Sequence, residues 1–434
     1  MKQSENVQLK NQLKSLIRDK GVASKAVGFA KKQNEPTAQL IARVKRISMA
    51  INRIEKAIKS QKPQTNKTET PSMAGLLPPQ FSQMLKNSQQ NNKGATEIIS
   101  KVPASQWEQY VNQHPNATVY HSLAIRSVIE ETFHNTCHYL AAINKEGIIQ
   151  GVLPLVEMKS KLFGHFIISL PYFNYGGILA SNAEAYSKLM RHAISLVKIN
   201  GADYVEFRHC LKNNDMLTRS EKVAMLLELP KNPEALWSNL GTKLRAQIKK
   251  AKRNNPSFSV GGIELLDDFY KVFAQNMRDL GTPVYSKSLF ISMLENNKKA
   301  YISVVYIDEK PVSCGFLLGW RNTLEIPWAS TIRKANKTDA NMYLYWNILK
   351  FAIEKEFSIF DFGRSNKDAS TYRFKKQWGA KPMELHWQYW LPDGMALPQI
   401  NPNNPKYKVT IALWKRLPVK IANIIGPPLV AYIP

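Results

Sequence analysis

The sequence predicts an α/β (α+β) protein of two tandem mixed sheets with flanking helices, preceded by a basic helical N-terminal arm. Two segments repeat one order of elements: an apolar hairpin, a further strand, a helix and another strand. Because a helix that joins two strands implies a parallel pair, and a hairpin adds antiparallel strands, each repeat should form a mixed sheet. The length of 434 residues suits two or three domains. Chance similarity of two α/β segments is the alternative to a duplication.

The N-terminal segment, residues 1–60, is predicted to be a basic amphipathic helical arm. Leu9, Leu13 and Leu16 recur at helical spacing among lysines and arginines. Residues 61–97 are rich in Gln, Asn, Pro and Ser, which is typical of a flexible linker. Together the two segments hold 18 basic and 6 acidic residues. They therefore suit RNA, a membrane surface or another anionic partner, although an ordinary solvated face has the same composition.

Residues 98–230 are predicted to form the first domain. The stretch "HYLAAINKEGIIQGVLPLVEM" indicates a hairpin, because a polar turn at 145–147 separates two apolar runs. A strand in "HFIISLPYFNYGGIL", a helix over 183–199 and the strand "YVEFRH" follow. The Gly-Gly pair in the loop suits either a ligand cleft or a tight turn packed in the core. The substrate-binding candidates in this domain are Tyr172, Asn174, Tyr175, Glu206 and Arg208.

Residues 231–391 are predicted to form the second domain. It begins with the helical stretch "PEALWSNLGTKLRAQIKKAKRN", which has an aliphatic face and a basic face. A hairpin with its turn at 308–310, the strand "TLEIPWAS", a helix over 339–355 and the strand "IFDFGRS" repeat the order of the first domain. The alternating "MELHWQYWL" is expected to be its final strand. Trp328 and Ser330 lie on the third strand, where a donor could line the sheet, although tryptophan is more often a core residue.

The stretch "FDFGRSNKDASTYRFKKQWGAKP" carries the candidate chemistry. Ligands in open α/β sheets gather at the carboxyl ends of strands, and Asp361 and Arg364 lie where a strand ends. A cation such as Lys375 can stabilise the oxyanion of acyl transfer, and Asp361 can accept the proton of an attacking amine. Asp361 and Arg364 could equally form a structural ion pair, and the lysines a solvated face. The catalytic candidates are Asp361, Arg364 and Lys375, with Ser365, Tyr372 and Phe374 as neighbouring substrate-binding candidates.

Several well-known site motifs are absent from the sequence. It has no G-x-G fingerprint, P-loop, G-x-S-x-G, H-E-x-x-H or C-x-x-C. The stretch "HNTCH" contains His134, Cys137 and His138, and the two histidines could share a helix face. A zinc site needs further ligands, so a structural role is expected and no metal site is predicted.

Composition points to a reducing compartment and an anionic partner. The formal net charge is +27, and three widely spaced cysteines do not suggest a disulfide framework. No long uncharged apolar run predicts a spanning helix. We therefore expect a cytoplasmic protein that can lie at the cytoplasmic membrane surface.

Four stretches resemble the FemAB-type branch of the GNAT N-acyltransferases: "LRAQIKKAKRN", "YISVVYIDEKPVSCGFLL", "FDFGRS" and "YRFKKQWGA". "LPYFNYGG" and "NPNNPKYKVTIALWKRLPVKIANIIGPPL" are similar, more narrowly, to the FemAB-related proteins associated with exosortase/PEP-CTERM systems. The likeness covers residues 98–434. It implies tandem GNAT-like domains and acyl transfer to an amine of a cell-envelope, peptidoglycan or exopolysaccharide precursor.

The resemblance also bears on the donor. In FemAB enzymes, which use aminoacyl-tRNA, a lysine after a phenylalanine interacts with the donor, and Phe374-Lys375 is the matching pair here. The Gly-rich phosphate loop of ordinary GNAT enzymes is missing from "TIRKANKTDANMY". No tightly bound cofactor is expected, and aminoacyl-tRNA, acyl-CoA and acyl carrier protein all remain open as donors.

Two questions stay open at this point. The C-terminal tail, residues 392–434, mixes Trp, Lys, Arg and aliphatic residues, so it could lie on a membrane surface or pack against the second domain. The main alternative to an enzyme is a non-catalytic protein that binds RNA or a membrane surface on an acyltransferase-derived fold. The oligomeric state is not predicted.

Overall fold

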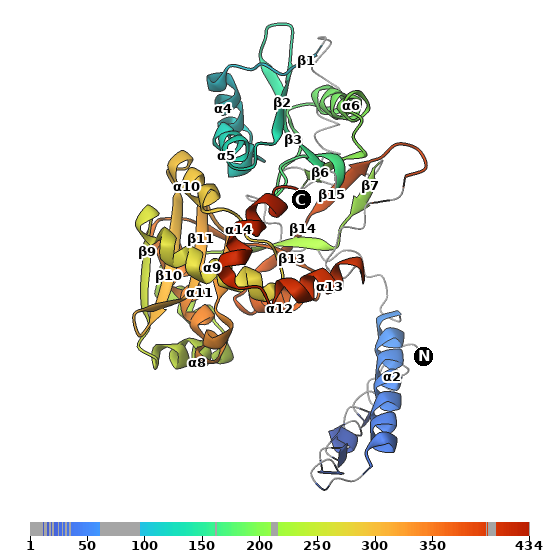
Figure 1. Cartoon of the computed structure of the whole chain (residues 1–434), viewed down its shortest axis with the longest axis vertical. Helices are drawn as coiled ribbons and strands as arrows, with labels where there is room; N and C mark the ends of the chain where they lie inside the picture. Colours follow the sequence, from blue (N-terminus) through green and yellow to red (C-terminus); the bar gives the residue numbers. More distant parts are fainter. Residues whose placement is uncertain are drawn as a thin grey trace. The chain divides into compact units, whose positions relative to one another are not determined.

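The computed structural model describes two compact units, Met1–Leu77 and Pro78–Pro434. In the first it describes helix α2 (Ala38–Ser60) and scattered residues between 12 and 37, and in the second residues 96–160, 163–209, 216–395, 397 and 405–433. Helix α2 agrees with the predicted helical arm. The predicted linker lies almost wholly outside the described residues. The second unit carries both sheets (Figure 1).

We call the first sheet and the helices that pack on it lobe 1. Its elements have the predicted order of hairpin, strand, helix and strand. The hairpin strands are antiparallel, and the strand after the helix runs parallel to the strand before it. The sheet order is β1-β2-β3-β4-β6-β15-β7, and a short β5 also pairs with β3. The strands are β1 (Glu97–Ile99), β2 (Thr136–Ile143), β3 (Ile149–Ser160), β4 (Gly164–Ile168), β5 (Leu179–Ala180), β6 (Tyr204–His209), β7 (Leu217–Arg219) and β15 (His386–Trp390).

The second sheet belongs to lobe 2 and has the same construction. Its order is β9-β10-β11-β12-β13-β8-β14, with the β12–β13 pair parallel. Position by position it matches the path of the first sheet, so the repeat seen in the sequence is a repeat of structure. The strands are β8 (Lys222–Glu228), β9 (Ser257–Gly261), β10 (Ala300–Ile307), β11 (Lys310–Trp320), β12 (Thr323–Thr331), β13 (Ile359–Asn366) and β14 (Lys381–Glu384).

The two lobes exchange one strand each. Strand β8 lies before residue 230 in the sequence but pairs with β13, whereas β15 lies near the end of the second half but pairs with β6. The prediction that "MELHWQYWL" is one strand of the second domain is therefore wrong: β14 ends at Glu384, Leu385 crosses over, and β15 joins the first sheet. Local alternation shows that a residue is in a strand, but it does not show which sheet supplies the partner. The expected boundary at residue 230 accordingly does not separate the two sheets.

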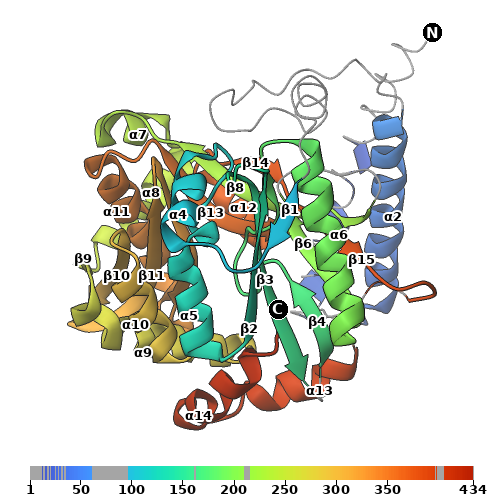
Figure 2. The same cartoon turned by 90° about the horizontal axis from the view of Figure 1, so that it is seen from above.

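Helices cover both faces of the first sheet (Figure 2). Alternate residues of β2 point to opposite faces: Leu140 joins a cluster with α6, and Ala141 joins a cluster with Trp107 of α4. Helix α6 begins after the N-cap Asn182 and ends at Gly201, whose positive φ of 64° closes the last turn. The helical elements of this lobe are α4 (Ala104–Gln113), η1 (Val119–His121), α5 (Leu123–Phe133) and α6 (Ala183–Asn200).

The second sheet is likewise covered on both faces. On β11, Leu317 belongs to the core cluster of α11, and Phe316 contacts aromatic rings of α9 and α10. Helix α11 is buried nearly all round, which matches its almost wholly apolar sequence. The helical elements are α7 (Pro233–Asn239), α8 (Thr242–Lys252), η2 (Ile263–Leu265), α9 (Leu266–Leu280), α10 (Lys287–Asn296), η3 (Arg333–Thr338), α11 (Ala340–Glu354) and α12 (Ser370–Gln377).

The C-terminal tail forms α13 (Pro405–Trp414) and α14 (Val419–Val430). Helix α14 contacts α9 of lobe 2, where the Gly426 backbone lies against Val284 (Figure 1). The tail thus packs on the second lobe, as one of the two predictions had it. In the part of the chain that the structure describes, no helix is long and apolar enough to span a bilayer.

Candidate active site

The candidate site begins where two parallel strands of lobe 2 part. Strands β12 and β13 pair over only three positions, and the last pair places Glu325 opposite Asp361. Both side chains are buried, with residue exposures of 5% and 3%. Neighbouring positions of adjacent strands lie on the same face of a sheet, so two carboxylates sit side by side in the protein interior.

A buried loop of lobe 1, residues 169–178, reaches this carboxylate pair. Two of its non-glycine residues, Leu170 and Tyr172, have positive φ angles of 59° and 72°. Such a backbone is costly and persists where surrounding contacts hold it. Arg208 supplies those contacts: its backbone N–H donates to Ser169 Oγ at 2.7 Å, and its Nη1 donates to the Phe173 carbonyl at 2.9 Å.

The loop delivers two polar side chains to the carboxylates. The Asn174 amide donates to Glu325 Oε1 at 2.6 Å, and the Tyr175 hydroxyl donates to Asp361 Oδ2. The second oxygen of Asp361 accepts the Gly363 backbone N–H at 2.7 Å. Asn174 and Tyr175, both predicted from the sequence, therefore lie in the site, and they come from the opposite lobe to the carboxylates.

Lys375 completes the polar centre from helix α12. It is buried, and its Nζ donates to the carbonyl oxygens of Gly363 at 3.0 Å and Arg364 at 2.8 Å. An ammonium carries three N–H donors, so one remains for another acceptor. The side chain does not point to bulk solvent, as a solvated lysine would; its neighbour Lys376 does.

The electrostatics of the centre follow from burial. Burial, and then the Asp361 carboxylate, raise the pKa of Glu325. Burial also raises the pKa of Asp361, against the hydrogen bonds of Tyr175 and Gly363. Burial lowers the pKa of Lys375 to about 8, while Asp361 and Glu325 oppose that change. Two carboxylates this close do not readily ionise together, so the pair retains a proton at a higher pH than isolated acids would.

Arg364 does not join Asp361. Among the described residues no ion pair links them, because a bulge follows Asp361 in the register of β13 with β8 and Gly363 there has a φ of 71°. The proposed Asp361–Arg364 structural pair is therefore wrong. The Arg364 guanidinium lies instead near the Trp387 ring, 5.1 Å from its centroid. Of the three predicted catalytic candidates, Asp361 and Lys375 therefore lie together at the carboxylate pair, whereas Arg364 lies at Trp387.

The equivalent residues of lobe 1 do form an ion pair. Arg208 Nε donates to Glu206 Oε1 at 2.8 Å, and both side chains are almost fully buried. Arg208 lies over the Trp387 ring at 4.2 Å. Arg208 and Arg364, predicted at corresponding strand ends, thus meet at one tryptophan.

The other predicted residues have different surroundings. The Tyr172 hydroxyl donates to the Ala431 carbonyl and its ring stacks on Phe133, so it ties the loop to the C-terminal tail. Trp328 belongs to an aromatic cluster that includes Phe173. Ser330 Oγ accepts a hydrogen bond from Asn276. Tyr372 and Phe374 pack against the core of lobe 2, while Ser365 is buried beside Arg364.

Sequence reasoning missed Glu325, Lys222 and Trp387. Glu325 had a signal: in "TLEIPWAS" it is the one acidic residue of a largely apolar stretch. Lys222 and Trp387 had none, because each lies on an exchanged strand and its neighbours come from the other lobe.

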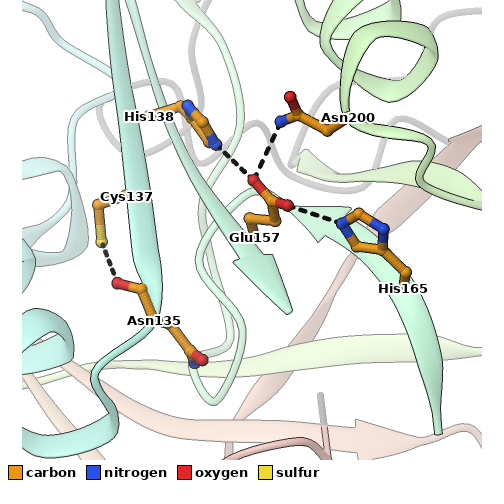
Figure 3. Close-up of polar contacts among 6 residues, drawn as sticks. All are labelled: Asn135, Cys137, His138, Glu157, His165 and Asn200. Atoms are coloured by element: carbon orange, nitrogen blue, oxygen red, sulfur yellow. Dashed lines mark hydrogen bonds and ion pairs between the residues drawn. The ribbon is translucent and has the colours of Figure 1, made fainter. Parts of the chain in front are cut away.

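The "HNTCH" stretch does not lie on a helix. His134 ends α5 with a φ of 56°, and Cys137 and His138 lie on β2. Figure 3 shows the Glu157 carboxylate of β3 bound by His138 at 2.9 Å and by His165 at 2.7 Å. The shared helix face is therefore wrong. Within the described residues no His, Cys, Asp and Glu cluster could hold a metal ion.

Comparisons with known proteins agree with this architecture. A sequence model of the acetyltransferase (GNAT) domain matches residues 238–376, which end just after Lys375. No curated protein matches the chain in sequence. The crystal structure of FemX is similar with a TM-score of 0.52 and 13% identity, over 73% of this chain and 100% of that chain.

Two further structures are more loosely similar. A tandem GNAT protein from the clavulanic acid biosynthesis pathway has a TM-score of 0.46 and 11% identity, over 70% of this chain and 100% of its own. L-PGS from Bacillus licheniformis has a TM-score of 0.45 and 12% identity, over 76% and 99%. The GNAT domain match thus gives residues 238–376 the sequence character of an acyltransferase domain, and the likeness to FemX concerns the fold.

Proposed function

We propose that the chain is a FemAB-like N-acyltransferase that moves an acyl or aminoacyl group to an amine of a cell-envelope, peptidoglycan or exopolysaccharide precursor. One observation carries the proposal: a buried ammonium, Lys375, shares its surroundings with two buried carboxylates at the junction of the lobes. The FemAB-like stretches of the sequence support the amine acceptor. The narrower likeness to exosortase-associated proteins supports an envelope precursor.

The carboxylates suit the proton transfer of this reaction. The amine nitrogen attacks the donor carbonyl, so a C–N bond forms and the nitrogen must lose a proton. Tyr175 and Asp361 provide a relay, in which the hydroxyl oxygen receives that proton and passes its own to Asp361. Glu325, whose pKa burial raises, keeps the neighbouring position uncharged and leaves Asp361 as the base.

The ammonium suits the charge that develops. Attack converts the carbonyl oxygen to an oxyanion, and the remaining N–H of Lys375 can donate to it in a water-poor setting. Collapse breaks the C–O bond of an ester or the C–S bond of a thioester. The leaving oxygen or sulfur takes up the proton that Asp361 received.

The donor is more consistent with an aminoacyl ester than with acetyl-CoA. Ordinary GNAT enzymes hold phosphates at a Gly-rich turn before a helix, whereas α11 has Asp339 at its N-cap, paired with Lys250 at 2.8 Å. The Asp339 carboxylate thus lies at the helix end where such a phosphate would bind. The exposed basic face of α8 could in turn contact a tRNA backbone. This face comprises Lys243, Lys249, Lys250 and Lys252 of α8 and the C-cap residue Arg253.

Replacement of Lys375 tests the proposal, with Lys376 as a matched control on the same helix. In a transfer assay that offers aminoacyl-tRNA, acyl-CoA and acyl carrier protein with envelope precursors, Lys375→Met should lower kcat by about 10²–10³-fold, the cost of one oxyanion donor. Lys376→Met should leave kcat unchanged because that side chain is exposed. Circular dichroism would verify that both variants fold.

Two outcomes would reject the proposal. Unchanged turnover in Lys375→Met would remove the ammonium from the reaction. Binding of RNA or anionic vesicles without turnover of any donor would favour the alternative, a non-catalytic binding protein on this fold.

A further inference from the structure

A cationic cluster lies where the exchanged strands cross, apart from the carboxylate pair. Three cations surround the Trp387 ring of β15: Arg208 of β6, Lys222 of β8 and Arg364 of β13, with centroid distances of 4.2, 3.7 and 5.1 Å. Trp387 and Arg208 belong to the first sheet, and Lys222 and Arg364 to the second. The cluster is therefore assembled only when the lobes exchange strands.

The positive charge of this cluster is under-compensated. Among the described residues its one ion pair joins Arg208 to Glu206. Arg208 Nη2 and Arg364 Nη1 are buried without a hydrogen-bond partner in the described part of the chain. Proteins seldom leave such donors unsatisfied, because a buried donor loses its hydrogen bonds to water and gains none from the protein. The Arg208 side chain is fully buried, so it cannot be satisfied by bulk water at the surface.

We propose that Arg208, Lys222 and Arg364 form a binding subsite for a phosphate group carried by a substrate. Arg208 Nη2 and Arg364 Nη1 offer N–H donors, and Lys222 adds a positive charge once a bound anion raises its lowered pKa, which together suit a tetrahedral dianion or diester. Lys222 and Arg364 are only partly buried, so the cluster is open on their side. The subsite is separate from acyl transfer and does not require the proposed reaction. Its two substrate sources are a nucleotide phosphate and a lipid phosphate.

Phosphate binding is measured on the full chain by isothermal titration calorimetry and by thermal melting. The probes are inorganic phosphate, adenosine monophosphate and water-soluble dihexanoyl phosphatidic acid, each against sodium chloride of equal ionic strength. We expect a Kd in the millimolar range or lower for inorganic phosphate. Of adenosine monophosphate and dihexanoyl phosphatidic acid, the one that resembles the natural phosphate source should have the lower Kd. The Arg364→Gln and Lys222→Met variants should weaken binding about tenfold or more.

A second readout distinguishes a binding subsite from a structural cluster. Removing one of several like charges relieves repulsion, so both variants should melt at a higher temperature than the wild type without ligand. A structural role predicts a lower melting temperature. Arg373→Gln is the control, because this arginine is exposed on α12.

Two results would overturn the subsite. One is the absence of phosphate-specific heat in the wild type, and the other is equal phosphate affinity in Arg364→Gln, Lys222→Met and the wild type. Phosphate binding without any acyl transfer would leave it standing and reject only the proposed function.

A different observation concerns the outer face of the C-terminal helices. Helix α14 turns its smallest residues inward: Ala422 and Gly426 are buried, and Gly426 lies against Val284. The opposite face is apolar and exposed, with Ile424 73% accessible. A helix normally buries its larger apolar residues, so this orientation leaves an apolar surface that nothing in the described part of the chain covers. The exposed apolar residues of α13 and α14 are Val409, Leu413, Ile421, Ile424 and Ile425.

We infer that this face rests on an anionic lipid bilayer. Exposed Lys415, Arg416 and Lys420 border the isoleucines, and the sequence has no acidic residue after Asp393. Aliphatic side chains entering the acyl boundary below a row of cations are typical of an interfacial helix. The inference does not depend on the chemistry of the enzyme. One face of the tail packs on the protein, whereas the prediction that the tail lies on a membrane surface stays a prediction.

Vesicle co-sedimentation tests this inference on the full chain. Vesicles of roughly three parts phosphatidylcholine to one part phosphatidylglycerol should bind the protein, pure phosphatidylcholine should bind it less, and added salt should release it. The double variant Ile421→Ser/Ile424→Ser should bind at least about tenfold more weakly. Ile199→Ser is the matched control, because Ile199 is equally exposed and belongs to another helix, α6. Absence of vesicle binding would overturn the inference. So would conversion of a dimer to a monomer by the double variant with vesicle binding unchanged, which would assign the face to a second copy of the chain.

Discussion

The two lobes have the same sheet order, but they have different side chains at the end of the same parallel strand pair. In lobe 1 the last parallel pair of β4 and β6 is Ile168 with Glu206, and in lobe 2 the last pair of β12 and β13 is Glu325 with Asp361. Lobe 1 therefore sets one carboxylate beside an aliphatic residue and neutralises it with Arg208. Lobe 2 sets two carboxylates together, and no arginine pairs with them in the described part of the chain. The difference separates a structural ion pair from a titratable pair suited to chemistry.

The comparison also shows how each lobe depends on the other. The carboxylates of lobe 2 receive their hydrogen bonds from Asn174 and Tyr175 of lobe 1. The arginine of lobe 1 holds the loop that carries them. In the reaction we propose, lobe 2 therefore supplies the two carboxylates and the ammonium, and lobe 1 supplies the side chains that contact the carboxylates.

Replacing the strand-end carboxylates should give the largest difference in kcat between the two lobes. Asp361→Asn should lower kcat by about 10²–10⁴-fold, because the base is lost. Glu206→Gln should lower stability, since it leaves a buried arginine unpaired, but lower kcat by less than about tenfold. Steady-state kinetics with the identified donor measures both. Equal losses of kcat would mean that the lobes do not differ in role.

The crossover helices should differ in how much stability they contribute. Ile348 of α11 is fully buried, so Ile348→Ala should cost about 2–5 kcal/mol of unfolding free energy. Ile199→Ala on α6 of lobe 1 removes an exposed side chain and should change it by less than about 0.5 kcal/mol. Urea denaturation followed by circular dichroism measures the two values. Similar losses would contradict the all-round burial of α11.

Removing the hydroxyl that joins the lobes should alter the pH dependence of transfer. The Tyr175 hydrogen bond lowers the pKa of Asp361, opposing burial. Tyr175→Phe should therefore raise that pKa, and the acid limb of the kcat profile should move to higher pH by roughly one pH unit. The rate falls as pH drops through this pKa because the base becomes protonated. An unmoved acid limb would exclude Asp361 as the titrating base.

A further expected effect is a pH-dependent stability from Lys222. Burial, then Arg364 and Arg208, lower the pKa of Lys222 to about 6, although Glu206 opposes them. The unfolded chain, with an ordinary lysine pKa of about 10.4, binds this proton more tightly. Stability should thus rise with pH between about 6 and 10, and Lys222→Met should flatten that slope. Denaturation midpoints across this range test it, and identical slopes in the two proteins would contradict it.

Much of the fold could be predicted from the sequence because its signals are local. The hairpin turns, the helices over 183–199 and 339–355, and the buried strand at "IFDFG" are each set by hydrophobic periodicity and turn residues. Asn174 and Tyr175 could be predicted as candidates because a Gly-Gly loop follows them, and they contact the two carboxylates. The role of Lys375 remains a prediction, although its burial agrees with it.

The pairing of distant strands could not be predicted in the same way. Alternation placed Trp387 in a strand but could not show that this strand joins lobe 1. The Asp361–Arg364 pair failed because the bulge at Gly363 changes where the next side chain goes. Glu325 and Asp361 are 36 positions apart, and only the register of a parallel pair brings them together.

The sequence by itself determined that this chain has two similar halves, a cationic character and a basic, aromatic segment after a buried strand. These follow from composition and from contacts within a few residues. The tertiary structure alone decided that strands β8 and β15 are exchanged, that two carboxylates lie side by side, and that three cations meet at Trp387. The physical reason is that charges interact through space, and long-range pairing sets which of them become neighbours.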